Sequence, residues 1–83
     1  DNHILQYISN EFFRITRYEI QESETISNET YSLCLILSGE GHIHIKDESY
    51  FLKAGQGFIV TSSCTSFRLT GSMDILISEP GHV

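Results

Sequence analysis

The chain has 83 residues and a formal net charge of −6, from eleven acidic and five basic side chains. A domain of this length buries only about 60–65% of its unfolded surface, so we expect a single domain over residues 1–83 with a modest core. The acidic excess argues against binding to nucleic acid or to an anionic membrane surface, because both need clustered Lys and Arg. No apolar run approaches the ~18 residues of a membrane span.

The ends and the cysteines of the chain suggest its origin. The sequence starts at Asp1 without a cleavable leader, so we expect a piece of a longer protein. Cys34 lies in an apolar run and Cys64 beside a polar loop. A bridge between them is one reading, but buried reduced thiols fit better and indicate the cytoplasm.

The apolar pattern predicts strands and no helix. Residues 4–9 form an expected extended entry segment, and a strand follows from Phe13, with a β-bulge near Thr16 and Arg17 where the apolar phase changes. Residues 21–29 are acidic and serine-rich, which predicts a long mobile loop. The remaining strands are expected at residues 31–37, 42–46, 50–53, 58–60, 67–69 and 73–77.

Glycines mark the predicted reversals. We expect turns at residues 38–41, 46–49, 55–57 and 71–72. Seven to eight short antiparallel strands joined in this way predict an all-β barrel or sandwich, which leaves few exposed sheet edges.

The strand at 31–37 is apolar on both phases, which is typical of a strand covered on both faces. One phase should point into the barrel and the other should pack against a covering layer. Leu35→Ala is therefore predicted to cost about 2–5 kcal/mol by leaving a cavity. The inward residues are Ser32, Cys34 and Ile36, and the covered ones are Leu33, Leu35 and Leu37.

Four motifs in the same order resemble the C-terminal cupin domain of bacterial type I mannose-6-phosphate isomerases. They are FFRITRY at 12–18, LILSGEG at 35–41, LKAG at 52–55 and LTGSMDILIS at 69–78. The resemblance covers nearly the whole chain and implies a small cupin-like jelly roll. Two departures are Gln56, where the family has aspartate, and Thr61-Ser62, where it has a proline step.

The same resemblance implies a function for the parent protein, the interconversion of mannose 6-phosphate and fructose 6-phosphate with zinc as cofactor. The zinc ligands and the catalytic arginine of that family belong to the preceding domain, so none is assigned here. The expected partner is the catalytic domain of the parent chain, with homo-oligomers left open, and the expected role is structural support without a cofactor in this domain.

His42 and His44 form an HxH pair, which binds metal in many cupins. In that pattern, HxH precedes a glutamate, and six residues separate the glutamate from the hairpin glycine. Counting back from Gly39 places Ser32 at the glutamate and residues 25–28 at the histidines, while Ser66 falls near the last ligand. We therefore expect no metal site, and we expect the two histidines on the solvated face, with Ile43 and Ile45 buried.

Other candidate chemistry is weak. Acidic side chains in a mobile loop are expected to be solvated, and Cys34 lacks a basic neighbour that would make it a nucleophile. The turn at 39–41 lacks the helix and lysine of a phosphate cradle. A small anion site from gathered arginines is an alternative to isolated rim charges. These acids are Glu22, Glu24 and Glu29, and the arginines are Arg14, Arg17 and Arg68.

Two alternatives to the isomerase domain stay open. One is the sugar-sensing cupin of an AraC-like transcription regulator, which would continue into a basic helical segment. The other is a stand-alone metal-free cupin that acts as an interaction module. Residues upstream of Asp1 would discriminate among the three.

Overall fold

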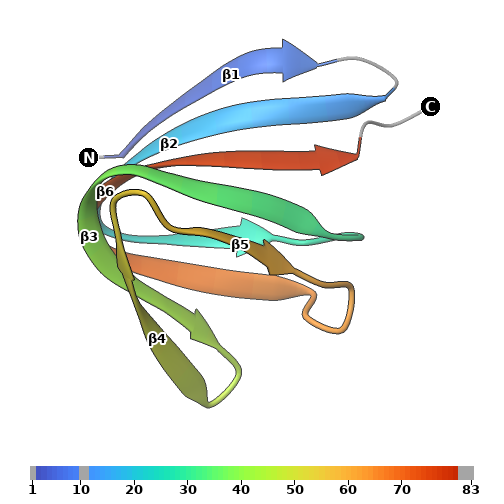
Figure 1. Ribbon diagram of the computed structural model, residues 1–83. Coiled ribbons are helices and arrows are strands. Elements are labelled where there is room, and N and C mark those ends of the chain that lie inside the picture. Colours follow the sequence, from blue (N-terminus) through green and yellow to red (C-terminus); the bar gives the residue numbers. More distant parts are fainter. Residues whose placement is uncertain (1, 10–11, 81–83) are drawn as a thin grey trace.

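The computed structural model describes residues 2–9 and 12–80, which form an antiparallel all-β structure (Figure 1). Its six strands pair in the order β1-β2-β6-β3-β4, with β5 also paired to β3. The all-β class is confirmed, but the strands are fewer and longer than predicted. They are β1 (His3–Ser9), β2 (Phe13–Ser27), β3 (Ser32–Ile45), β4 (Glu48–Lys53), β5 (Gly57–Val60) and β6 (Ser66–Pro80).

The difference arises because β2, β3 and β6 each bend in the middle instead of reversing (Figure 1). The turns predicted at 38–41 and 71–72 and the loop predicted at 21–29 are therefore wrong. Positive φ angles mark the bends at Glu22 (80°), Gly39 (79°) and Gly71 (114°). Gly71 faces both Glu22 and Gly41 in the ladder, so the three strands bend at one level.

Glycine is needed here because the bent backbones approach very closely. A Cβ atom on Gly41 would lie 2.0 Å from the carbonyl oxygen of Thr70. A Cβ on Gly71 would lie 2.6 Å from the Cα of Gly41. These glycines, predicted to form hairpin turns, instead permit a bend and a close strand crossing.

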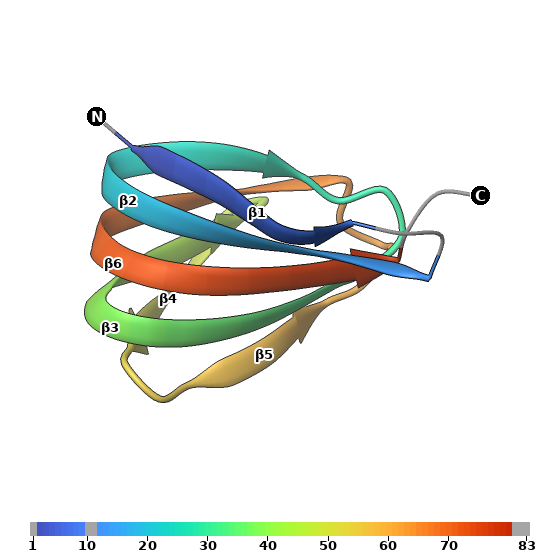
Figure 2. The same ribbon diagram turned by 90° about the horizontal axis from the view of Figure 1, so that it is seen from above.

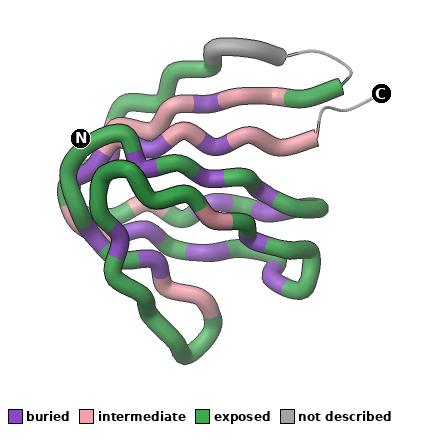
Figure 3. Tube along the Cα trace, in the orientation of Figure 1, coloured by how far each residue is buried: buried purple, intermediate pink, exposed green. Residues whose placement is uncertain are grey.

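The bends divide the structure into two layers that face each other (Figures 1 and 2). We call them layer I and layer II. Layer I contains β1, β5 and the segments 13–21, 32–38 and 72–80; layer II contains β4 and the segments 23–27, 40–45 and 66–70. Buried residues alternate with exposed ones along the strands, as Figure 3 shows, and the fully buried aliphatic side chains come from both layers: Ile20, Ile36, Leu69, Ile75 and Ile77.

The polar segment after Glu22 follows the same alternation. Ile26 points into the core, whereas the neighbouring Thr25 and Ser27 are exposed. The segment pairs with residues 66–70 of β6. Its composition therefore reflects a strand with one solvated face.

The bulge predicted near Thr16 and Arg17 is also wrong for β2, whose register with β6 is unbroken. The irregularity lies in the facing strand β1, between Gln6 and Ile8. The apolar phase along β2 changes without a bulge. Ile15 lies on the outer face of layer I and Ile20 on the inner face, so both faces of this strand carry apolar side chains.

Of the two faces of β3 at residues 32–37, the structure confirms the predicted burial of one and contradicts that of the other. Ser32, Cys34 and Ile36 are buried, which confirms the inward phase. The described residues supply no layer over the other phase, where Leu33, Leu35 and Leu37 are 40–44% exposed. The covering layer on which the predicted cost of Leu35→Ala depends is therefore absent from the part of the chain that the structure describes. Within residues 2–9 and 12–80, no helix is long and apolar enough to span a membrane.

Candidate functional site

A buried hydrogen-bond network contains Asn28 and Ser32, which lie among the residues that the spacing argument placed at metal-ligand positions. Asn28 follows the end of β2, and Ser32 begins β3. The Ser32 Oγ donates to Asn28 Oδ1 at 2.7 Å. The Asn28 Nδ2 donates to the carbonyl oxygens of Thr61 at 2.8 Å and Cys64 at 2.7 Å. The Asn28 amide thus binds the loop between β5 and β6, and the Ser32 hydroxyl holds that amide in place.

The network is closed off from solvent. Asn28 and Ser32 are 1% and 0% exposed, and the backbone N–H of Asn28 donates to the carbonyl of Thr65 at 2.8 Å. Buried polar groups with internal partners stabilise a fold, whereas a metal would require free lone pairs that converge on one point. This arrangement can lock a loop to the core; it offers no imidazole or carboxylate.

Ser66, which the spacing argument placed near the last ligand position, does not join this network through its side chain. Ser66 is exposed and begins β6, and its carbonyl accepts a hydrogen bond from the Cys64 thiol at 2.8 Å. In the part of the chain that the structure describes, no three His, Cys, Asp or Glu side chains are grouped closely enough to hold a metal ion. The donor set present does not fit zinc.

The histidines lie on the outer face of layer II. Ile43 is buried and Ile45 packs against the core, as predicted, so His42 and His44 point away from it. His44 Nε2 lies 2.8 Å from Thr70 Oγ1, and the His42 ring meets Phe51 edge to face at 5.5 Å. These contacts attach both rings to the surface of the sheet.

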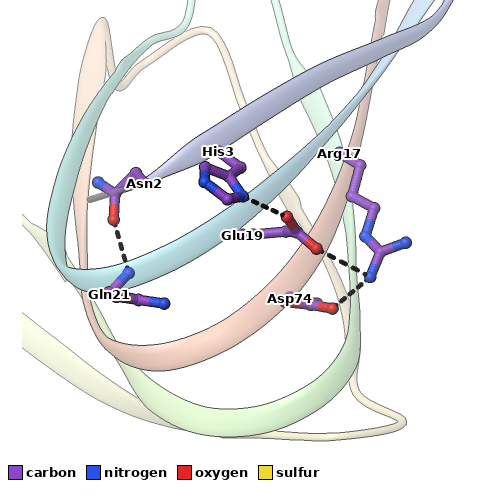
Figure 4. Close-up of polar contacts among 6 residues, drawn as sticks. All are labelled: Asn2, His3, Arg17, Glu19, Gln21 and Asp74. Carbon is purple, nitrogen blue, oxygen red and sulfur yellow. Dashed lines mark hydrogen bonds and ion pairs between the residues drawn. The ribbon is translucent and has the colours of Figure 1, made fainter.

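The three arginines do not gather, so the anion site considered for them is wrong. Arg14 shares the inner phase of β2 with Thr16 and pairs with Glu79 at 3.0 Å. Arg17 lies on the opposite face, between Glu19 and Asp74, as Figure 4 shows. Arg68 belongs to layer II, opposite Thr25 and His44 in the ladder.

The three acids predicted to occupy a mobile loop are ordered and separated. Glu22 is exposed at the bend, and Glu29 is exposed after the end of β2. Glu24 is half-buried and accepts a hydrogen bond from Asn2 Nδ2 at 2.9 Å. This arrangement does not place two of them together as an acid and a base.

Sequence reasoning missed a polar cluster on the inner face of layer I. Tyr18 lies on the same phase as Arg14 and faces Ile75 of β6. Burial, followed by the charge of Glu79, raises the pKa of Tyr18. The signal was present in the alternation of Arg14, Thr16, Tyr18 and buried Ile20, which predicts a shared face once a continuous strand is recognised.

Cys34 is buried in the core, as predicted. Burial, and then the charge of Glu79, raises the pKa of its thiol to about 12. The thiol stays neutral in the folded chain at ordinary pH, which disfavours a nucleophilic role.

This shift predicts a pH dependence of stability. Because the folded pKa is raised, the stabilising contribution is complete below the unfolded value of 9 and is lost as pH rises toward about 12. We expect the free energy of unfolding to fall more steeply over this range in the wild-type chain than in Cys34→Ala. Urea titrations at several pH values measure both slopes, and equal slopes would contradict the buried neutral thiol.

Comparison with known proteins agrees with this architecture. The family model for the mannose-6-phosphate isomerase cupin domain matches residues 3–80. Two relatives from Bacillus subtilis strain 168, YvyI and GmuF, are named as candidate mannose-6-phosphate isomerases. They are 25% and 30% identical to this chain over 77 and 78 residues, which is 92% and 93% of it. The chain spans only about a quarter of their length, 24% and 25%.

Solved structures show the same fold. Mannose 6-phosphate isomerase from Bacillus subtilis superposes with a TM-score of 0.83 at 21% identity, over 92% of this chain and 24% of that one. A cupin superfamily protein from Desulfitobacterium hafniense gives a TM-score of 0.83 at 16% identity, over 98% of this chain and 78% of that one. The chain therefore has the cupin fold and belongs to the family of mannose-6-phosphate isomerase cupin domains.

Proposed function

We propose that this chain is a metal-free, supporting cupin domain of a longer mannose-6-phosphate isomerase. The groups that interconvert mannose 6-phosphate and fructose 6-phosphate, zinc included, would belong to another domain of that protein. The family match, together with relatives about four times as long, supports this reading over the AraC-like regulator.

The buried network supports the metal-free part of the proposal. Asn28 and Ser32 stand where metal-binding cupins carry histidine and glutamate, and their hydrogen bonds are made within the chain. The two cysteines are free and buried, which supports a reducing compartment such as the cytoplasm.

The observation that carries the supporting role is the exposed row of Leu33, Leu35 and Leu37 on the outer face of layer I. Leu35 faces Leu76 of β6 in the ladder, and Leu33 faces Ile59 of β5, which is 61% exposed. Contiguous apolar side chains on a sheet face are typical of a surface that another domain covers. We propose the catalytic domain of the parent chain as the partner on this face.

Leu35→Ala tests this docking face in two contexts. In the 83-residue chain it should cost less than about 1 kcal/mol, because Leu35 is 42% exposed. In the longer protein it should cost about 2–5 kcal/mol, because docking would bury the side chain. Hydrogen exchange of the core amides reports the stability of this domain in both proteins.

Ile75→Ala is the matched control, since Ile75 is fully buried in the chain itself. It should reduce core protection by a similar amount in both contexts. A Leu35→Ala effect that is equally small in the longer protein would contradict docking through this face.

A further inference from the structure

A cavity of about 420 Å³ lies between β4 and β5, and we call it the β4/β5 notch. The two strands diverge from the loop that joins them, as Figure 1 shows, and each pairs with a different half of β3. The floor of the notch includes Ile43, Leu52 and Val60, all buried core residues. Tyr50, which is about half exposed and lies opposite Ile43 in the ladder, stands in its wall.

The chemistry of the lining is unlike that of the chain as a whole. Every lining residue is uncharged, although the chain carries a net charge of −6. Pockets for small molecules are concave, mainly apolar and typically about 300–1,000 Å³, with few polar groups. The notch has this size and character, and an uncharged lining gives no compensation for the desolvation of an ion.

Gln56 supplies a polar group to the lining. Its Oε1 accepts the backbone N–H of Lys53 at 2.7 Å, which fixes the orientation of the side-chain amide. The Nε2 group can therefore donate a hydrogen bond to a ligand.

We propose that the β4/β5 notch binds a small uncharged molecule that combines an aromatic or aliphatic body with one hydrogen-bond acceptor. The body would lie over Ile43, Leu52 and Val60, beside the Tyr50 ring. The acceptor would receive a hydrogen bond from Gln56 Nε2. This inference is independent of the isomerase proposal, because it uses neither the metal position nor the outer face of layer I.

Acetophenone is a suitable probe, since it has one ring and one carbonyl acceptor. A titration followed by methyl NMR should give saturable shifts centred on Ile43, Leu52 and Val60. Tyr50→Ser should weaken binding at least about fivefold by removing a wall. Tyr31→Ser is the matched control, because Tyr31 is 45% exposed and does not line the notch, and it should leave the affinity unchanged.

Ethylbenzene has a similar shape without the acceptor and tests the role of Gln56. Gln56→Met should weaken acetophenone about threefold while leaving ethylbenzene unchanged. Equal effects on the two molecules, or no effect on either, would overturn the assigned donor. Shifts centred on Leu33 and Leu35, or no saturable shifts at all, would overturn the site.

Discussion

Gly41→Ala should be among the most destabilising single substitutions in this chain, with a loss of at least about 3 kcal/mol. The new Cβ would lie 2.0 Å from the carbonyl oxygen of Thr70. That oxygen belongs to the backbone of β6, which is paired to both β2 and β3 at the bend. Relief of the contact would therefore separate strands that hold the two layers together. Urea unfolding followed by circular dichroism measures the loss.

Gly57→Ala is the matched control for this prediction. Gly57 has no positive φ, and a Cβ there would meet only the Cys34 carbonyl oxygen, at an ordinary 3.6 Å. Its stability should change by no more than about 0.5 kcal/mol. If Gly41→Ala and Gly57→Ala were equally stable, the close crossing of β3 and β6 would be contradicted.

The second large effect is expected at Asn28. Asn28→Ala should cost about 2–4 kcal/mol, because it deprives the carbonyls of Thr61 and Cys64 of their donor and Ser32 of its acceptor. The loop between β5 and β6 would also lose its attachment to the core. Equilibrium unfolding of the variant measures this cost.

A double-mutant cycle separates the network from a simple loss of packing. Ser32→Ala removes the partner of Asn28 Oδ1. If the two side chains act together, the double variant should be more stable than the sum of the single losses predicts. Strictly additive losses would contradict the coupling.

The sequence correctly predicted which side chains point inward and outward along a strand, because this depends on local alternation. The inward phase of Ser32, Cys34 and Ile36 and the outward phase of His42 and His44 follow from a period of two, and the structure has both. The chain bends where turns are predicted, because a glycine indicates an unusual backbone conformation but not the direction of the chain that follows it. At Gly71, that direction depends on Glu22 and Gly41, which are distant in sequence.

In the candidate site, too, local features could be predicted from the sequence, whereas contacts between distant residues could not. Spacing alone singled out Ser32, which the structure places in a buried hydrogen-bond network. The partners of Asn28 could not be predicted, because Cys64 lies 36 residues away on a different loop. Likewise, the apolar character of Leu33, Leu35 and Leu37 predicted burial, but the described chain does not contain the surface that would bury them.

The two layers and the buried network of Asn28 and Ser32 support the proposed structural role. The cupin framework depends on backbone bends and an aliphatic core, and neither requires a metal. Asn28 binds the β5–β6 loop to that core through hydrogen bonds, and Ser32 donates a hydrogen bond to Asn28. A domain of this kind can retain its fold while another part of a longer protein performs catalysis.

Assay of mannose 6-phosphate conversion by the purified 83-residue chain, with and without added zinc, tests the supporting role most directly. Arg14 and Arg17 are already paired with carboxylates, and the net charge of −6 disfavours a phosphorylated sugar. We predict no fructose 6-phosphate above the enzyme-free blank. Turnover in proportion to the concentration of this chain would contradict the account.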